Sequence, residues 1–374
     1  MSTFIPPRKP ADALWLLAAR SRGGQHWVAN AECHIETIDV AGHSVPVTVP
    51  DASPTPASYV LCPQSAWLRY ARDEVLRHLR PPFSVLANVA TAGLYAPLAG
   101  LMQASHLHQA AIIGNHLIST NLYPAWQASE LQQMTTTLAD EFPMRPLLMR
   151  NICPEVHPEL AQGLREAGWQ LVPARMIYLC DPQQPKVWKH NHVKQDARLL
   201  SNAEVEVISA DMLRARDLPA LRQLFRQLFI DKHSHLNPDF TPAFFELCLE
   251  TGFLELTALR WQNRLVGVLG LYACPDSGWA TTPLIGYDTS LPPALGLYRR
   301  LMALLLQQSR ERQLRLHYSS GASQFKRARG GSASLEYTAI YHQHLSGIRR
   351  QGNRVFSGLF QHLAPGLLRR ADQL

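Results

Sequence analysis

Strand-like and helix-like segments follow one another in a fixed order through the second half of this 374-residue chain. Short runs rich in β-branched residues predict strands, and apolar residues spaced three or four apart predict helices. The expected strands are 205–208, 254–261, 265–273, 279–288, 314–318 and 335–341, and the expected helices are 218–229, 242–251 and 296–310. Because such elements pack as helices against a central sheet, the order predicts a mixed α/β domain.

The first half resembles a shorter, less complete copy of the second. Its expected strands are 34–40, 45–49, 57–62, 110–121, 146–152 and 170–180, and its expected helices are 65–79, 126–142 and 158–167. We therefore predict two tandem domains, each with a central mixed sheet flanked by helices. The predicted division is an incomplete N-terminal domain at 1–185, a basic helical connector at 186–204, a C-terminal domain at 205–350 and a basic tail or helix at 351–374.

Positive charge is concentrated near the C-terminal end of the chain. The net charge is +7, and residues 299–350 contain ten Lys or Arg against two acidic residues. A local field of that sign favours an anionic partner, such as a nucleotide cofactor, a tRNA or a membrane surface, whereas a solvated basic surface is the alternative.

Cysteine and histidine patterns predict neither a disulfide framework nor a metal site. The six cysteines are scattered without a CxxC pair, which suits reduced thiols in a cytoplasmic protein. Four His-x-His pairs occur, but no carboxylate or cysteine set completes any of them, so no metal is expected. The apolar run 13–19 is short and lacks a cleavage site, and we interpret it as a helical turn rather than a signal peptide.

Residues 81–129 contain no Asp, Glu, Lys or Arg. Buried core is the favoured interpretation, followed by the wall of an apolar substrate pocket or an interfacial patch. A membrane-spanning helix is disfavoured because Asn88, Gly93, Pro97 and Gly100 interrupt the apolar run.

The segment 319–341 combines a small-residue turn with clustered cations. Ser319, Ser320 and Gly321 follow a predicted strand, and Lys326 begins a short basic segment that ends at two glycines. Small residues permit close backbone approach, and exposed turn amides beside cations suit a phosphate-bearing ligand. We expect the chemistry, or the binding of its donor, at this segment.

This part of the chain resembles the FemAB-like and CelD-like members of the GNAT superfamily, in which two GNAT-like domains are fused. The most specific element is the pattern G-A-x-x-x-K-x-x-R-G, which begins at Gly321 and ends at Gly330. The resemblance extends over roughly residues 205–345 and includes Gly286-Tyr287-Asp288 and the run 292–299. It implies an acyl donor, usually acyl-CoA, and an amine acceptor; in the FemAB branch the donor is an aminoacyl-tRNA.

GNAT enzymes hold the donor pyrophosphate with a loop of the form [Q/R]-x-x-G-x-[G/A]. Only Gly296 matches here, because Pro293 and Tyr298 occupy the other two positions. The resemblance therefore assigns donor binding to a broader set of residues, in which cations supply the phosphate contacts. That set is Gly296, Arg299, Ser320, Gly321, Lys326, Arg327 and Arg329.

Acyl transfer needs a deprotonated amine, a stabilised oxyanion and a protonated leaving group. Asp288, at the end of a predicted strand, is the first candidate to position or deprotonate the amine; a turn aspartate is its alternative. Tyr287 is a candidate hydrogen-bond donor to the leaving group, or simply packs. His235 is a candidate base, since histidine titrates near neutrality.

The acceptor is expected to contact the loop 231–238, which joins two helices of the second domain. The predicted contacts are Lys232, His233, Asn237 and, in the last strand, Glu336. Glu336 could instead balance the cations of the basic segment as an ordinary salt bridge.

The sequence thus predicts an N-acyltransferase that acts by direct attack in a ternary complex, because no activated serine or cysteine constellation is visible. The expected acceptor is a small amine or amino-acid-like molecule, and the expected donor is acyl-CoA, another acyl carrier or aminoacyl-tRNA. A DNA partner is not expected, and peripheral membrane contact ranks last. A FemAB-type transferase and a non-catalytic binding protein on a decayed fold are the alternatives.

Overall fold

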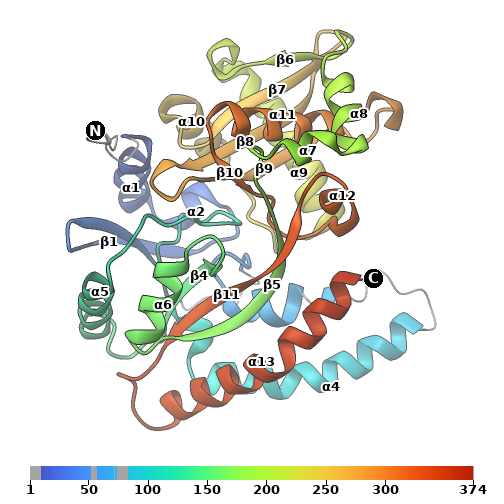
Figure 1. Cartoon of the computed structure of the whole chain (residues 1–374). Helices are drawn as coiled ribbons and strands as arrows, with labels where there is room; N and C mark the ends of the chain where they lie inside the picture. Colours follow the sequence, from blue (N-terminus) through green and yellow to red (C-terminus); the bar gives the residue numbers. More distant parts are fainter. Residues whose placement is uncertain (1–9, 52–56, 71, 74–82, 374) are drawn as a thin grey trace.

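One mixed sheet of eleven strands runs through this protein (Figure 1). The computed structural model describes residues 10–51, 57–70, 72–73 and 83–373. The strands are β1 Cys33–Val40, β2 His43–Pro50, β3 Ala111–Ile113, β4 Leu147–Ile152, β5 Gln170–Cys180, β6 Glu206–Ile208, β7 Glu255–Trp261, β8 Arg264–Cys274, β9 Trp279–Tyr287, β10 Arg315–His317 and β11 Ser332–Tyr341.

Helices cover both faces of this sheet. They are α1 Pro10–Arg22, α2 Gly24–Trp27, α4 Phe83–Ala104, α5 Ala128–Glu141, α6 Pro158–Glu166, α7 Pro185–Lys189, α8 Asn191–Leu200, α9 Leu218–Arg226, α10 Pro242–Thr251, α11 Leu297–Glu311, α12 Ser323–Arg327 and α13 Gly347–Gln373. Two π-helical turns, Ser65–Arg69 and Gln227–His233, complete the elements near the site described below.

The strand order is β1-β2-β3-β4-β11-β5-β10-β9-β8-β7-β6. In each half an antiparallel run leads to one parallel pair, β3 with β4 and β9 with β10. The next strand in the sheet then comes from the other half, because β11 pairs with β4 and β5 pairs with β10. The two halves have therefore exchanged their final strands, which also pair with each other.

The predicted mixed α/β class is confirmed, with one difference. The two halves share one continuous sheet, because each supplies the last strand of the other. The predicted boundaries at residues 185 and 205 stay a prediction.

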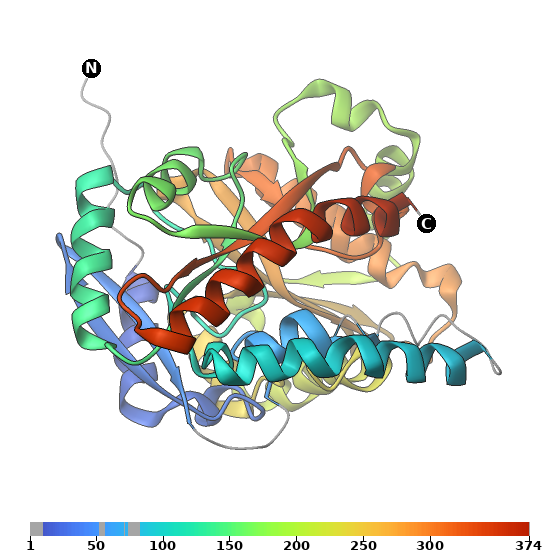
Figure 2. The ribbon, with the colours of Figure 1, turned by 90° about the horizontal axis from the view of Figure 1, so that it is seen from below.

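Buried apolar side chains form a separate layer on each face of each half. In the second half, α9, α10 and α1 cover one face, and α11 with α8 covers the other. In the first half, α5 and α6 cover one face. The opposite face packs against α4 and α13, which lie together on the side of the molecule facing the viewer in Figure 2.

Local sequence signals set the ends of several helices. The Thr241 hydroxyl accepts a hydrogen bond from the Phe244 amide at the start of α10, and Pro242 occupies the first helical position. Gly252 ends the same helix in the left-handed conformation, with φ of 68°.

Four predicted elements differ from the structure. The strand predicted at 57–62 is wrong: this segment forms a turn, in which the Leu61 and Cys62 amides bond to the Ser58 carbonyl. The strand predicted at 110–121 is confined to 111–113, because Gly114 and Leu117 adopt positive φ.

The connector is two helices rather than one, because His190 is extended and separates α7 from α8. Of the helix predicted at 65–79, the first turn is π-helical, and residues 71 and 74–79 lie outside the described residues.

The charge-free segment contains α4, and Met102 at its end is fully buried against the first half. None of the helices in the described ranges is long and apolar enough to span a bilayer. In the region predicted as a basic tail or helix, residues 347–373 form α13.

Gly286 sets how closely α9 approaches β9. A Cβ at this position would lie 2.5 Å from the Phe225 amide nitrogen and 2.6 Å from the Leu224 carbonyl oxygen. We expect Gly286→Ala to lower the free energy of unfolding by about 1–3 kcal/mol, because backbone atoms must move apart. Urea unfolding measures this, with Gly358→Ala on α13 as the control, since its Cβ would meet open space. Equal stability of the two variants would contradict the packing argument.

Candidate functional site

Arg175 on β5 and Glu336 on β11 face each other across the two exchanged strands. The arginine Nε lies 2.6 Å from the carboxylate Oε1. Only 1% of the Glu336 side chain is exposed, whereas 21% of Arg175 is exposed. The pairing register shifts directly after Glu336, so the pair lies at a bulge. The exchange therefore brings together a buried ion pair with one member from each half.

Two further side chains contact the Glu336 carboxylate. Asn151 Nδ2 donates to Oε1 at 2.9 Å, and His317 Nε2 lies 3.2 Å from Oε2. The His317 Nδ1 accepts the Ser319 amide hydrogen bond at 3.1 Å. The proton of a neutral His317 must therefore reside on Nε2, where it faces the carboxylate.

The pKa values in this cluster follow from burial and charge. Burial raises the pKa of Glu336, but Arg175 and His317 more than offset this, so its pKa lies well below the ordinary value. Burial lowers the pKa of His317, and Glu336 only partly opposes the shift. At neutral pH the cluster therefore holds an ionised carboxylate, an arginine cation and a neutral imidazole.

The small-residue turn predicted from the sequence lies directly against this cluster. Ser319, Gly321 and Ala322 have φ of 60°, 77° and 48°, so three of four consecutive residues are left-handed. The buried Lys326 donates from Nζ to the carbonyls of Ser319 at 3.3 Å and Ser320 at 2.6 Å. Non-glycine residues adopt such backbone only where neighbouring interactions hold it, and Lys326 supplies two of them.

Lys326 is an unusual lysine because its side chain is only 4% exposed. Burial and, to a smaller extent, the nearby Arg175 charge together lower its pKa to about 7. A neutral amine still carries two N–H groups, which suffice for the two carbonyls.

Polar groups of the first half also bond to this turn. Thr120 Oγ1 donates to Ser319 Oγ at 3.2 Å, and Arg175 Nη1 lies 3.5 Å from Ser320 Oγ. Arg175 Nη2 donates to the Ser119 carbonyl at 3.1 Å. The turn thus contacts residues that lie 199 and 145 positions away in the sequence.

A cavity of about 180 Å³ opens beside the ion pair. Its lining combines apolar and aromatic side chains with a few charged and polar groups. Its lining residues are Tyr59, Pro63, Ala66, Trp67, Tyr70, Ile112, Leu148, Arg150, Asn151, Ala174, Arg175, Ser320, Glu336 and Thr338. An apolar cavity with a few convergent polar groups is the usual form of a small-molecule site.

Arg150 gives this cavity an excess of positive charge. Its side chain is 8% exposed, and Nη1 donates to the neutral oxygens of Val60, Asn115 and Ile118. Within the described residues, no carboxylate forms an ion pair with Arg150. Two arginines therefore line the cavity against one glutamate.

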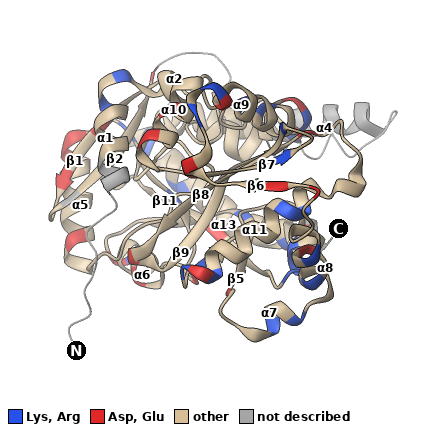
Figure 3. Ribbon diagram, turned by 90° about the horizontal axis from the view of Figure 1, so that it is seen from above, with Lys and Arg blue, Asp and Glu red and all other residues tan. Residues whose placement is uncertain are grey.

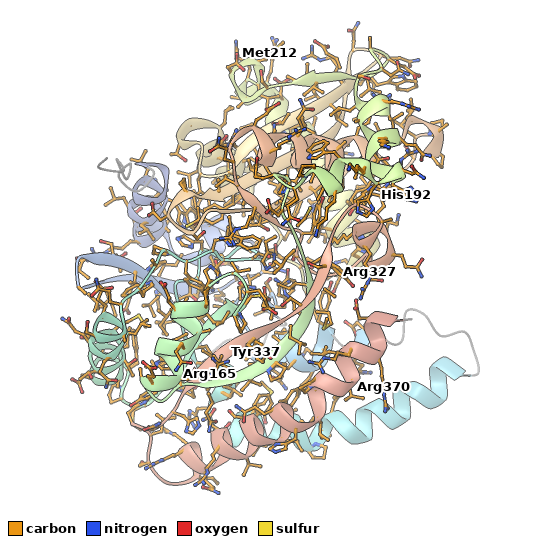
Figure 4. The ribbon with its side chains drawn as sticks, in the orientation of Figure 1. Arg165, His192, Met212, Arg327, Tyr337 and Arg370 are labelled. Atoms are coloured by element: carbon orange, nitrogen blue, oxygen red, sulfur yellow. The ribbon has the colours of Figure 1, made fainter. Side chains whose placement is uncertain are left out.

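The arginines predicted to bind donor phosphates have internal partners. Arg299 and Arg329 both bond to the buried Asp196 carboxylate of α8, at 2.6 and 2.5 Å. Arg327 pairs with Asp372 near the end of α13. Figure 4 shows Arg327 beside the last turns of that helix. Carboxylates of the chain thus pair with the arginines that we expected to bind donor phosphates. A donor contact for these arginines stays a prediction.

The N-terminus of α11, where a GNAT-type phosphate loop was expected, is covered by α8. Gly296 has φ of 58°, and a Cβ on it would lie 2.4 Å from the Leu199 side chain. The buried Arg300 bonds to the carbonyls of Leu295 and Asn202. Side chains of the chain itself therefore occupy this end of the helix.

Asp288 lies outside the cavity and forms a turn. Its carboxylate accepts hydrogen bonds from the Ser290 amide at 3.0 Å and the Ser290 hydroxyl at 2.5 Å. The Ser290 bond lowers the pKa of Asp288. This geometry fits the turn-aspartate alternative. The Tyr287 ring lies 6.0 Å from the Tyr298 ring, in a packing arrangement.

The predicted acceptor loop lies next to the cavity without lining it. Lys232, His233 and His235 are exposed, whereas Asn237 is buried and its Nδ2 donates to the Phe229 carbonyl. The Leu236 carbonyl accepts the Tyr59 amide, and Tyr59 lines the cavity. Of the predicted site residues, the structure brings Ser320 and Glu336 to the cavity wall, and Lys326 bonds to the Ser320 carbonyl, whereas Gly321 is exposed.

Sequence reasoning missed Arg150, Asn151, Arg175 and His317. The first three come from the half without a recognisable motif, and only the strand exchange brings them to Glu336. One signal was available: Arg150 and Asn151 are polar residues within a run whose six positions are all buried. Among the described residues, no group of three His, Cys, Asp or Glu could hold a metal ion.

Comparison with solved structures identifies this arrangement as a known fold. The L-PGS structure from Bacillus licheniformis superposes with a TM-score of 0.50 at 10% identity, covering 94% of this chain and 98% of the other. FemX superposes with a TM-score of 0.50 at 8% identity, covering 92% and 98%. Neither a protein-family model nor a curated protein matches the sequence. The chain therefore has the FemAB-type fold of two GNAT-like halves.

The buried ion pair predicts a large and non-additive cost of mutation. Glu336→Gln leaves Arg175 without its counter-ion, and Arg175→Met leaves a buried carboxylate without its main cation. Each single change should lower the free energy of unfolding by about 3–5 kcal/mol, and the double variant should lose clearly less than the sum. Denaturant unfolding of the four proteins gives the coupling energy. Additive losses would contradict a direct interaction.

Lys326 predicts a pH dependence of stability. The ordinary pKa of lysine is 10.5, against about 7 in the folded protein. The unfolded chain therefore binds more protons above pH 7, and folding stability should rise with pH by up to about 1.4 kcal/mol per unit. Lys326→Met should remove this rise between about pH 7 and 9, whereas Lys232→Met, at an exposed lysine, should not. Parallel curves for wild type and Lys326→Met in urea unfolding would contradict the burial argument.

Proposed function

We propose that this protein is an acyl-group transferase that moves an aminoacyl group from tRNA to an amine acceptor held in the cavity at the exchanged strands. The observation that carries the proposal is the buried network of Glu336, Arg175 and His317 at the wall of that cavity. A FemAB-type fold and a preorganised polar wall together suit acyl transfer, in which fixed dipoles stabilise developing charge.

The reaction is a direct displacement. The acceptor nitrogen attacks the carbonyl carbon of the aminoacyl ester, a C–N bond forms and the C–O bond to the tRNA ribose breaks. The nitrogen loses a proton and the ribose oxygen gains one. A thioester intermediate on the enzyme is disfavoured, because burial raises the pKa of the nearby Cys153 to about 12.

An aminoacyl-tRNA donor is favoured by the distribution of exposed cations. Lys186, Lys189, Lys194 and Arg198 are exposed on α7 and α8, and Figure 3 shows Lys and Arg on these helices. Such a surface suits the phosphates of an RNA. A tRNA donor would place the reaction in the cytoplasm. Acyl-CoA, which the GNAT resemblance also implies, is the second candidate, but the covered N-terminus of α11 offers no open pyrophosphate site.

The acceptor is expected to carry an anionic group as well as an amine. Arg150 and Arg175 exceed the single carboxylate of the cavity, and a carboxylate or phosphate on the acceptor would restore charge balance. Arg150 holds its guanidinium with neutral oxygens alone, so it is the residue to which we assign this group.

A transfer assay tests the proposal. Bulk tRNA charged with radiolabelled amino acids and labelled acyl-CoAs serve as the two donor classes, with amine acceptors that either carry or lack a carboxylate or phosphate. We expect transfer from charged tRNA to anionic acceptors. Arg150→Met should lower kcat/KM by about tenfold to a hundredfold for these acceptors, but not for neutral amines.

The control is Arg165→Met, which removes an exposed cation from α6 and should leave transfer unchanged (Figure 4). Transfer from acyl-CoA alone would contradict the tRNA donor. No transfer from either donor class would support a non-catalytic binding protein and contradict the proposal as a whole.

A further inference from the structure

A stripe of exposed apolar side chains runs along the outer side of α13. The exposed fractions are 71% for Ile348, 48% for Val355, 40% for Leu359, 56% for Leu363 and 64% for Leu367. Successive members are seven or four residues apart, so they share one side of the helix. These five account for half of the ten large hydrophobic side chains that are exposed in the described residues.

The inner side of α13 is already packed against the protein. Phe356 is fully buried, and its ring lies 5.2 Å from that of Trp67. Phe360 stacks on Phe356 at 4.5 Å, and Asn353 donates to the Ser105 carbonyl of the segment after α4. The outer stripe is therefore a second apolar surface, which no other described part of the chain covers.

Arginines occupy the remaining exposed positions of the same helix. Arg350, Arg354, Arg369 and Arg370 are exposed, and Figure 4 shows Arg370 on the last turns of α13. The one acidic residue of the helix, Asp372, pairs with Arg327. The outside of α13 thus combines an apolar stripe with uncompensated positive charge.

The neighbouring helix α4 adds no charge to this side of the molecule. It lies beside α13 (Figure 2), and its sequence contains no Asp, Glu, Lys or Arg. The exposed positions of its second half include Gly93, Ala96 and Pro97. Among the described residues of the two helices, the one acidic side chain is Asp372, which is paired with Arg327, so the remaining charges on this side are cationic.

We propose that α13 docks this face of the protein onto an anionic lipid bilayer, with the apolar stripe in the headgroup region and the arginines on lipid phosphates. A helix with an apolar stripe, arginines beside it and no exposed acid has the composition of an interfacial helix. A second copy of the chain fits less well, because it would bring two cationic helices together. The surface is independent of the transfer reaction.

The docking surface and the cavity lie on the same face of the sheet. Trp67 lines the cavity and also packs against Phe356 and Phe360 on the inner side of α13. A protein docked through α13 would therefore hold the cavity close to the bilayer.

Sedimentation with vesicles tests the docking surface. The full-length protein is mixed with equimolar phosphatidylcholine–phosphatidylglycerol vesicles or with pure phosphatidylcholine vesicles. We expect binding to the anionic vesicles to be stronger by about tenfold or more, and to weaken with salt. The double substitution Leu359→Glu/Leu363→Glu should lower it by about tenfold or more.

Met212→Glu is the matched control, because Met212 is 46% exposed at the opposite end of the molecule (Figure 4). Arg350→Glu/Arg354→Glu gives a second variant that leaves the apolar stripe intact and should also bind more weakly. Circular dichroism shows that each variant is folded.

Three results would overturn the proposal. The first is wild-type binding that does not distinguish anionic from neutral vesicles. The second is an equal loss in Met212→Glu. The third is a wild-type dimer by light scattering that becomes monomeric in Leu359→Glu/Leu363→Glu while vesicle binding is absent, which would assign the stripe to a second copy.

Discussion

The Arg175–Glu336 pair joins two strands that the halves of the molecule have exchanged. A carboxylate that is 1% exposed must be neutralised and hydrogen-bonded, and an unpaired one costs several kcal/mol. Asn151 on β4 and Arg175 on β5 both bond to this carboxylate, and both belong to the first half of the chain. Glu336 itself belongs to the second half. Neither half could bury this residue alone, so the polar centre exists only once the exchange is complete.

The internal repeat explains why so many polar groups meet at this point. β4 and β10 occupy equivalent places in the two halves, each as the second member of a parallel pair. Asn151 within the end of β4 and Ser319 after β10 are both left-handed, with φ of 61° and 60°. Such backbone costs about 1–2 kcal/mol for a residue other than glycine, and here hydrogen bonds to Glu336, His317 and Lys326 hold it. The site therefore contains one left-handed residue at the end of the second strand of each parallel pair.

The sequence was sufficient for most of the elements and for part of the site. Ser320, Lys326 and Glu336 lie within one short segment, so a local motif could connect them, and periodicity located the strands around them. The partners from the first half could not be found, because strand exchange leaves no local pattern. The counter-ions could not be predicted either. Arg299 and Arg329 bond to Asp196, which lies 103 and 133 positions away in the sequence. Residue spacing contains no information about such distant pairs. The sequence therefore overestimates the number of free cations.

The ion pairs of this basic segment also link the cavity to two exposed cationic surfaces. One is formed by α7 and α8, and the other by α13. Arg329 ties the end of α12 to Asp196 on α8, and Arg327 ties it to Asp372 on α13. Lys326, between them in sequence, holds the carbonyls of the turn at the cavity wall. α12 is thus anchored to α8, which carries exposed cations of the connector, and to α13, which carries the apolar stripe. The basic segment therefore fixes the left-handed turn relative to both surfaces, and its contact with a donor stays a prediction.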